Sequence, residues 1–96
     1  MQLNSITFEW DKHNEEKLWE RHQVTAEEAE EAFFNRNLVL TGKKQASQEK
    51  RYYLYGATDP GRYLFIVFTL KDREVARVIS ARSMQKSELS WFKKRQ

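Results

Sequence analysis

The sequence has no cysteine, only two histidines, three glycines and one proline. Without cysteine there can be no disulfide framework, thiol nucleophile or thiolate zinc site. His13 and His22 lie nine residues apart, which matches no short zinc-binding motif, so we expect neither a metal ion nor a cofactor. The few glycines and prolines, set against 13 aromatic residues, argue against a disordered chain.

The sequence also lacks a long hydrophobic run. Its longest apolar stretch, residues 63–70, is far shorter than the roughly twenty residues that cross a bilayer. The first twenty residues contain five acids and no apolar run, which is unlike a signal peptide. We therefore expect a cytoplasmic protein without membrane contact, and the length of 96 residues predicts one domain over residues 1–96.

Positive and negative charges are separated along the chain, although the formal net charge is only +3. Residues 1–35 contain three bases and nine acids, a charge of −6, whereas residues 36–96 contain 14 bases and five acids, a charge of +9. This asymmetry indicates that the second part has affinity for a polyanion such as a nucleic acid. The acidic first part is expected to be solvated helix surface.

Two helices are predicted near the start of the chain, after a first strand in which apolar and polar residues alternate over residues 6–10. Asp11 is the expected N-cap of a helix that runs to about His22. Thr25 and Glu28 have the spacing of a capping box, which predicts that a second helix begins there. The front of the domain is therefore expected to be mainly helical.

Three or four strands in a meander are predicted after these helices. The candidate segments are residues 38–40, 51–57, 63–70 and 74–81. The continuous apolar run of residues 63–70 predicts a central strand buried on both faces, with turns at residues 58–62 and 71–73 and a polar, basic loop at residues 41–49. Ser83 is the expected N-cap of a last helix. The fold class is therefore α+β, with two N-terminal helices packed on one face of a small, mainly antiparallel sheet and a C-terminal helix.

A set of short motifs is spread over about residues 6–92. In order, they are Phe8-Glu-Trp-Asp11, Arg21-His22, Val24-Thr-Ala-Glu-Glu-Ala29, Phe33-Phe34, Arg51-Tyr52 with Gly56, Val67-Phe68-Thr69, and Arg77-Val-Ile-Ser-Ala-Arg82 followed by Met84 and Glu88. Their order and spacing resemble the BrnT family. The resemblance implies a RelE-like fold and a toxin of a type II toxin–antitoxin pair, a metal-independent endoribonuclease that cleaves RNA and inhibits translation.

The resemblance also implies partners. RNA is the implied substrate. The usual protein partner of the family is a DNA-binding antitoxin, similar to BrnA, that is encoded beside the toxin. Such an antitoxin neutralises the toxin and represses their shared promoter, so the toxin meets DNA only indirectly, through the antitoxin.

Two positions depart from the family's pattern. Gln23 stands where the family usually has glycine, and Leu18 stands where it often has asparagine. Both are expected near the active edge of the protein. They keep open a second function, a catalytically degenerate toxin homologue that binds an antitoxin and co-regulates its own promoter. A third is a small RNA-binding module without toxin ancestry.

Cleavage of RNA without a metal ion uses the 2′-hydroxyl as an internal nucleophile. It needs a base for the hydroxyl proton, cations for the charge on the phosphate, and an acid for the leaving 5′-oxygen. His22 is the candidate proton carrier, because histidine exchanges protons near neutral pH. The alternatives for His22 are an interaction with the helix dipole or a packing role, and His13 is expected at the surface.

Arginine suits the phosphate because its planar fork donates two hydrogen bonds at once. Arg77 is expected to share one face of its strand with Val75, Ile79 and Ala81, where a cation is costly unless it is paired or faces an anion. We therefore predict that Arg77 binds the scissile phosphate. The alternative is a salt bridge to an acid of the N-terminal helices.

Arg82, Arg51 and Glu88 complete the predicted active site. Arg82 leaves its strand just before the last helix, whose first N–H groups favour anions, with ordinary capping geometry as the alternative. Arg51 begins an aromatic strand and is expected to contact phosphate or to be a solvated charge at the sheet edge. Glu88 is expected to pair with an active-site arginine or to serve as the base, with an exposed helix glutamate as the alternative. Further RNA contacts, with core packing or a solvated loop as the alternative, are predicted at Trp10, Lys43, Lys44, Lys50, Tyr53 and Arg62.

Overall fold

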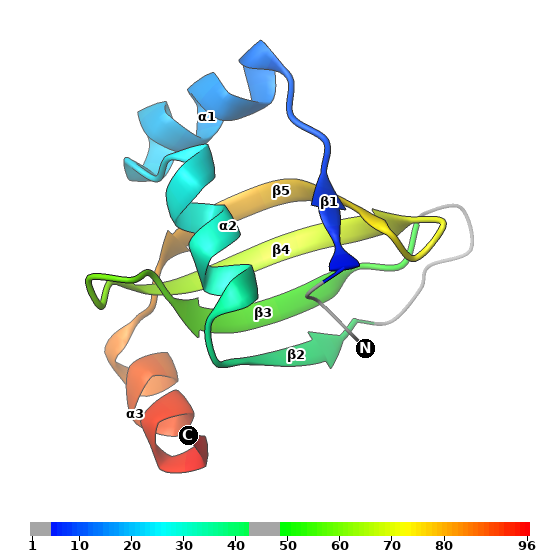
Figure 1. The fold of residues 1–96 in the computed structure, drawn as a ribbon. Coiled ribbons are helices and arrows are strands. Elements are labelled where there is room, and N and C mark those ends of the chain that lie inside the picture. The colour runs from blue at the N-terminus through cyan, green and yellow to red at the C-terminus, as the bar shows by residue number, and fades with distance from the viewer. Residues whose placement is uncertain (1–4, 43–48) are drawn as a thin grey trace.

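The computed structural model describes residues 5–42 and 49–96. Along these residues the chain forms strand β1 (Thr7–Phe8), helices α1 (Lys12–His22) and α2 (Ala26–Phe34), strands β2 (Asn37–Thr41), β3 (Tyr52–Ala57), β4 (Tyr63–Lys71) and β5 (Val75–Ser83), and helix α3 (Lys86–Arg95). The predicted α+β class, with two helices before the main run of strands and one after it, is confirmed (Figure 1). Of the three or four strands expected after α2, the described chain has four. None of its helices is long and apolar enough to cross a membrane.

The strands of the described chain form one sheet in the order β1-β5-β4-β3-β2. β1 runs parallel to β5 and the other neighbours are antiparallel, so the sheet is mainly antiparallel, as predicted. β1 is shorter than the alternation over residues 6–10 indicates, because only Thr7 and Phe8 pair with β5. This pairing brings the β1–α1 junction beside the start of β5.

The first two helices begin where their capping residues predict. The Asp11 side chain accepts a hydrogen bond from a first-turn backbone N–H at 2.7 Å, and Thr25 and Glu28 form the expected reciprocal capping box. The prediction for the last helix is wrong. Ser83 still pairs with β4 as the final residue of β5, so α3 begins only after its N-cap residue, Gln85.

α1 and α2 lie on one face of the sheet and cover the core (Figure 1). Phe33 of α2 packs edge-on against Phe68 of β4, with ring centroids 4.8 Å apart. Gly56 in β3 permits this close approach of α2, because a Cβ at that position would lie 2.9 Å from the carbonyl oxygen of Ala32. The apolar side chains enclosed between helices and sheet are the main source of stability.

Burial alternates along β4 from Tyr63 to Phe68, so the prediction that residues 63–70 are buried on both faces is wrong for most of the strand; on the side of β4 away from the helices only Thr69, 8% exposed, is buried. Ile66 and Phe68 are fully buried beneath the helices, whereas Phe65 and Val67 are half-buried on the opposite side. We call this opposite side of the sheet, away from α1 and α2, the open face. Among the described residues, α3 packs against one end of this face, where Trp91 and Phe92 contact Tyr55 and Tyr63.

An irregularity in β5 changes which side chains face the helices. The pairing with β4 skips one residue of β5, Ile79. Before this bulge, Arg77 lies on the open face opposite Thr69, and beyond it Ala81 is fully buried on the helix side. The prediction that Arg77 and Ala81 share a face is therefore wrong.

Candidate active site

Three neighbouring strands bring Arg77, Thr69 and Arg51 into one row on the open face. Arg77 pairs directly with Thr69, and Arg51 precedes β3 at the position beside Thr69. A surface hollow is lined by these three residues together with Glu49 and Ile79. The row therefore joins two of the three arginines that the sequence predicts at the phosphate.

The Arg77 side chain is 55% exposed and lies between two carboxylates of the β1–α1 junction. Its guanidinium is 3.3 Å from Glu9 Oε1 and 3.5 Å from Asp11 Oδ2, so Arg77 forms a salt bridge, but to acids just before α1 rather than to an acid within the N-terminal helices. Exposed pairs of this kind contribute at most about 1 kcal/mol. Because they are weak and open to solvent, a phosphate can compete for Arg77, and its role there stays a prediction.

Glu49 is a carboxylate of this site that sequence reasoning missed. It lines the hollow beside Arg77 and also a neighbouring one toward β1. In the sequence it stands in a polar, basic stretch with no motif around it, and only the folded structure places it beside residues of β4 and β5. A carboxylate can accept a proton, so Glu49 is a candidate base of this site. The described chain holds no group of three or more acidic or histidine side chains that could bind a metal ion.

Arg82 lies in a second row, opposite Phe65 of β4, which in turn pairs with Tyr55 of β3. Its guanidinium donates to both carboxylate oxygens of Glu88 in α3, at 2.8 and 3.0 Å, and stands 4.5 Å from the centre of the Phe65 ring. The hydrogen bonds from Arg82 lower the pKa of Glu88, and they raise the pKa of Arg82. Burial, and then the charge of Glu88, raises the pKa of the Tyr55 phenol. Glu88 thus pairs with Arg82, which is one of the two roles predicted for it.

The two rows are separated along β4 by the four positions from Phe65 to Thr69, about 13 Å at the rise of a β-strand. The two guanidinium groups also bind different elements, Arg77 the β1–α1 junction and Arg82 helix α3, so the structure does not gather them at one point. Tyr53 lies between the rows, with its ring stacked on that of Phe65 at a centroid distance of 5.9 Å. Along the open face, the hollow with its two arginines and Glu49 is followed by an aromatic strip and then by the Arg82–Glu88 pair.

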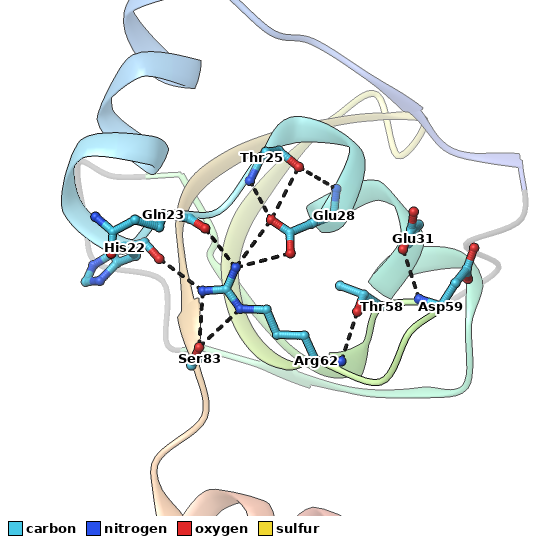
Figure 2. Close-up of polar contacts among 9 residues, drawn as sticks. All are labelled: His22, Gln23, Thr25, Glu28, Glu31, Thr58, Asp59, Arg62 and Ser83. Atoms are coloured by element: carbon cyan, nitrogen blue, oxygen red, sulfur yellow. Dashed lines mark hydrogen bonds and ion pairs between the residues drawn. The ribbon is translucent and has the colours of Figure 1, made fainter.

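Arg62, predicted as an RNA contact, makes its contacts inside the protein (Figure 2). Its guanidinium donates to the backbone oxygens of His22 and Gln23 at 3.0 and 2.7 Å. It also donates to Ser83 Oγ at 3.2 Å and forms an ion pair with Glu28 at 3.1 Å. These contacts, which we call the Arg62 junction, tie the end of α1, the start of α2 and the end of β5 to the β3–β4 turn.

The charge of Glu28 is stabilised at the Arg62 junction. Burial by itself raises the pKa of Glu28, but a backbone hydrogen bond from Thr25 and the hydrogen bond and charge of Arg62 outweigh burial, so the pKa is lowered. The ionised carboxylate serves both the capping box of α2 and the ion pair. The junction lies at the end of β5 that is remote from Arg77.

His22 and the two departures from the family's pattern also lie near this junction. The His22 ring is turned away from Arg62 (Figure 2), and His22 is not among the residues that line the hollow beside Arg77. Gln23 ends α1 with a left-handed backbone, φ 51° and ψ 44°, a conformation that favours glycine. Leu18 is 3% exposed in the core. The departures thus fall at a helix end and in the core, and neither residue lines the hollow.

The remaining predicted RNA contacts lie apart from the hollow or outside the described residues. Trp10 packs against the core, and its indole N–H donates to a glutamate of α2 at 2.8 Å. Its ring is therefore on the helix side of the sheet. Lys50 lies with its Nζ 5.8 Å from the centre of the Tyr52 ring. Lys43 and Lys44, with most of the predicted loop at residues 41–49, fall outside the described residues.

Comparisons with known proteins identify a family. A model of the ribonuclease toxin BrnT, of type II toxin–antitoxin systems, matches residues 10–88. The crystal structure of the Brucella abortus ribonuclease toxin BrnT is similar in fold, with a TM-score of 0.59, 20% sequence identity, and coverage of 84% of this chain and 96% of that chain. Among curated proteins no match was found. Because the family model spans most of the sequence, the chain belongs to the BrnT family of ribonuclease toxins of type II toxin–antitoxin systems.

Proposed function

We propose that this protein is a metal-independent endoribonuclease that cleaves RNA on the open face, in the hollow beside Arg77. The observation that carries the proposal is the row in which Arg51 and Arg77 line one hollow with Glu49, in a chain of the BrnT family. Two guanidinium groups supply charge and N–H donors for a phosphate that becomes more negative in the transition state.

In the proposed reaction, Arg51 and Arg77 bind the scissile phosphate and the Glu49 carboxylate removes the proton of the 2′-hydroxyl. The 2′-oxygen attacks phosphorus and the bond to the 5′-oxygen breaks, which leaves a 2′,3′-cyclic phosphate and a 5′-hydroxyl. The leaving oxygen takes its proton from Lys71, which lines the adjoining hollow with Glu49 and Arg77. Glu49 is left protonated and Lys71 neutral, and transfer of one proton from Glu49 to Lys71 through water restores both groups, so no further reactant is consumed.

The aromatic strip and Arg82 give the RNA a path beyond the hollow. Tyr53 and Phe65 present stacked rings between the two rows, and unpaired bases stack on such rings without sequence preference. Arg82 lies at the far end of this strip. To bind a different phosphate of the same strand, its guanidinium would exchange its contacts with Glu88 and the Ser83 backbone oxygen for that phosphate. The open face therefore favours single-stranded RNA.

Substitution distinguishes Glu49 from His22, the alternative proton carrier. We expect Glu49→Gln to lower the cleavage rate by about 100-fold, the range for loss of a general base, whereas His22→Gln should retain most activity because His22 does not line the hollow. The measurement is the single-turnover rate on a labelled single-stranded RNA. The reverse result would assign the proton transfer to His22.

The proposed activity is tested with the purified chain and RNA in the presence of a chelator. We expect cleavage that the chelator does not reduce and products that end in a cyclic phosphate. Loss of activity with the chelator and its recovery with Mg²⁺ would contradict metal independence. A protein that binds RNA and a DNA-binding antitoxin but cleaves nothing would instead be the degenerate co-regulator.

We further propose that cleavage inhibits translation, and that an antitoxin similar to BrnA neutralises the protein by covering the open face. Membership of a toxin–antitoxin family supports a partner of this kind, and the cations of the open face would attract an acidic segment of it. Expression of the chain alone should arrest bacterial growth, and co-expression with an adjacent DNA-binding reading frame should restore it. Growth arrest that the neighbour does not relieve would contradict the proposed neutralisation.

A further inference from the structure

The last helix carries a basic surface that the proposed active site does not include. Lys86, Lys93, Lys94 and Arg95 are exposed on α3, and none of them forms an ion pair with another residue of the described chain. The one acid of this helix, Glu88, is only 17% exposed and already paired. We call the four exposed cations the α3 basic surface.

Aromatic rings restrict the position of two of these cations. The Nζ of Lys93 lies 5.3 Å from the centre of the Tyr63 ring, and the Cζ of Arg95 lies 4.6 Å from the Trp91 ring. Arg95 also donates to the backbone oxygen of Trp91 at 3.0 Å. Both cations remain exposed, so they can bind an anion with less loss of side-chain freedom than an unrestrained lysine.

The α3 basic surface continues the open face beyond Arg82. α3 is joined to this end of the sheet by the Arg82–Glu88 pair and by the ring of Trp91, 4.9 Å from that of Tyr55. Phe92 of the same helix is fully buried. Because the large apolar residues of α3 pack toward the sheet, its outer surface is charged, which fits a polyanion in water rather than the interior of a membrane.

We propose that the α3 basic surface is a docking site for the RNA backbone, separate from the hollow in which cleavage is proposed. The inference rests on the proposed ribonuclease function. RNA that follows the open face past Arg82 reaches α3 next, where the four cations neutralise its phosphates. Lys93, Lys94 and Arg95 lie beyond residue 88, where the family match ends, so family membership alone does not imply this site.

The test compares two triple variants that lose the same charge. One carries Lys93→Gln, Lys94→Gln and Arg95→Gln; the control carries Lys12→Gln, Lys17→Gln and Arg21→Gln, all exposed on α1. Binding is measured by fluorescence anisotropy over a range of salt concentrations. The probe is a single-stranded RNA with 2′-O-methyl groups throughout, which lacks the nucleophile and so cannot be cleaved.

We expect the α3 variant to bind this probe about tenfold more weakly at low salt, with a salt dependence shallower by about 2 in log–log slope, because each single-strand phosphate contact contributes about 0.7. The α1 control should bind as the wild type does. With unmodified RNA, the α3 variant should raise KM and leave kcat unchanged, because docking is remote from the reacting phosphate.

Wild-type affinity in the α3 variant, or an equal loss in the α1 control, would overturn the docking site. So would a loss of antitoxin binding with RNA binding unchanged. If the triple variant unfolds, Lys94→Gln alone tests the proposal, because Lys94 makes no ring contact in the described chain. Its salt-dependence slope should change by about a third as much as expected for the triple variant, since one phosphate contact of three is lost. If the wild type fails to cleave unmodified RNA, the ribonuclease proposal fails, and the binding data still decide whether α3 holds RNA.

Discussion

The Arg62 junction and the hollow beside Arg77 lie near opposite ends of β5, and in each of them an arginine forms an ion pair with a carboxylate. Arg62 is 31% exposed, and besides Glu28 it binds two backbone oxygens at the end of α1. Arg77 is 55% exposed, and its partners Glu9 and Asp11 are themselves half exposed. The same residue type, paired with the same kind of group, thus has very different surroundings at the two places.

The kind of acceptor explains what each arginine can do. The backbone oxygens that Arg62 binds belong to the end of a packed helix, so they cannot move away unless α1 moves. The carboxylates beside Arg77 can rotate into water at little cost, because exposed ion pairs are weak. An ion pair alone therefore does not identify a structural arginine, whereas backbone acceptors on a distant element, such as the end of α1 for Arg62, do.

Arg77→Ala should give the largest effect and sharpen the comparison most. We expect the RNA cleavage rate to fall by about 100-fold, the size typical for loss of a group that stabilises transition-state charge, while the free energy of unfolding changes by less than about 1 kcal/mol. Single-turnover cleavage and chemical denaturation measure the two quantities. Arg36→Ala, which removes another exposed arginine, is the matched control and should change neither. Arg77→Ala protein that cleaves normally would remove Arg77 from the active site.

Arg62→Ala should show the opposite pattern. We expect the free energy of unfolding to fall by about 2 kcal/mol, because Glu28 loses its charge partner and two backbone oxygens lose a charged donor. When the variant is assayed well below its melting temperature, so that it is folded, its kcat should stay within about threefold of the wild-type value. Loss of one strong hydrogen bond in the active site would lower kcat by more than this. Arg62→Lys retains the charge without the planar fork, so its free energy of unfolding should lie between those of the wild type and Arg62→Ala. Loss of cleavage in a fully folded Arg62 variant would break the distinction between the two arginines.

Gln23→Gly should stabilise the protein by about 0.5–1 kcal/mol, because glycine adopts the left-handed backbone at the end of α1 without the strain of a Cβ. The Gln23 side chain offsets part of this strain through hydrogen bonds to the backbone oxygens of Trp19 and Glu20. Gln23→Ala keeps the strain and removes these bonds, so it should destabilise. Thermal melting of the wild type, Gln23→Gly and Gln23→Ala gives their order of stability. A glycine variant less stable than the wild type would mean that the side-chain hydrogen bonds of Gln23 outweigh the backbone strain.

Local signals in the sequence were enough for most of the fold. The N-cap at Asp11 and the capping box of Thr25 and Glu28 predict both helix starts, because a cap depends on residues only three apart. The α+β class followed from helices that precede hairpin-connected strands. The resemblance to the BrnT family, carried by motifs along almost the whole chain, was confirmed by the family match.

The errors and omissions concern contacts between residues far apart in the sequence. The bulge at Ile79 leaves no local pattern, yet it decides that Ala81 and Arg77 face opposite sides of the sheet. Glu49 lies before β3 and lines the hollow with residues of β4 and β5 that are at least 20 positions away. Arg62 pairs with Glu28, 34 residues away. An arginine in a turn is expected to be an exposed cation until the packing of α1, α2 and β5 is known.

Glu28→Gln should give the smallest effect, and it tests the charge at the Arg62 junction by pH. The folded-state pKa of Glu28 is lowered from the ordinary value of 4.5, so the folded state favours its ionised form. The stability from this charge is therefore present in full above the unfolded-state pKa and is lost as pH falls through the lower folded-state value. Glutamine does not titrate, so the variant should lose less stability between about pH 5 and pH 3 than the wild type does.

The pH-dependent difference should be only a few tenths of a kcal/mol, since an incompletely buried ion pair is screened by solvent. Urea denaturation over this pH range measures it. In an Arg62→Ala background the pH-dependent effect of Glu28→Gln should shrink, because a main cause of the lowered pKa is gone. An undiminished effect would mean that Thr25 and the capping box, rather than Arg62, hold the charge. The junction would then owe its stability to local helix capping, and Arg62 would resemble Arg77 more than its burial suggests.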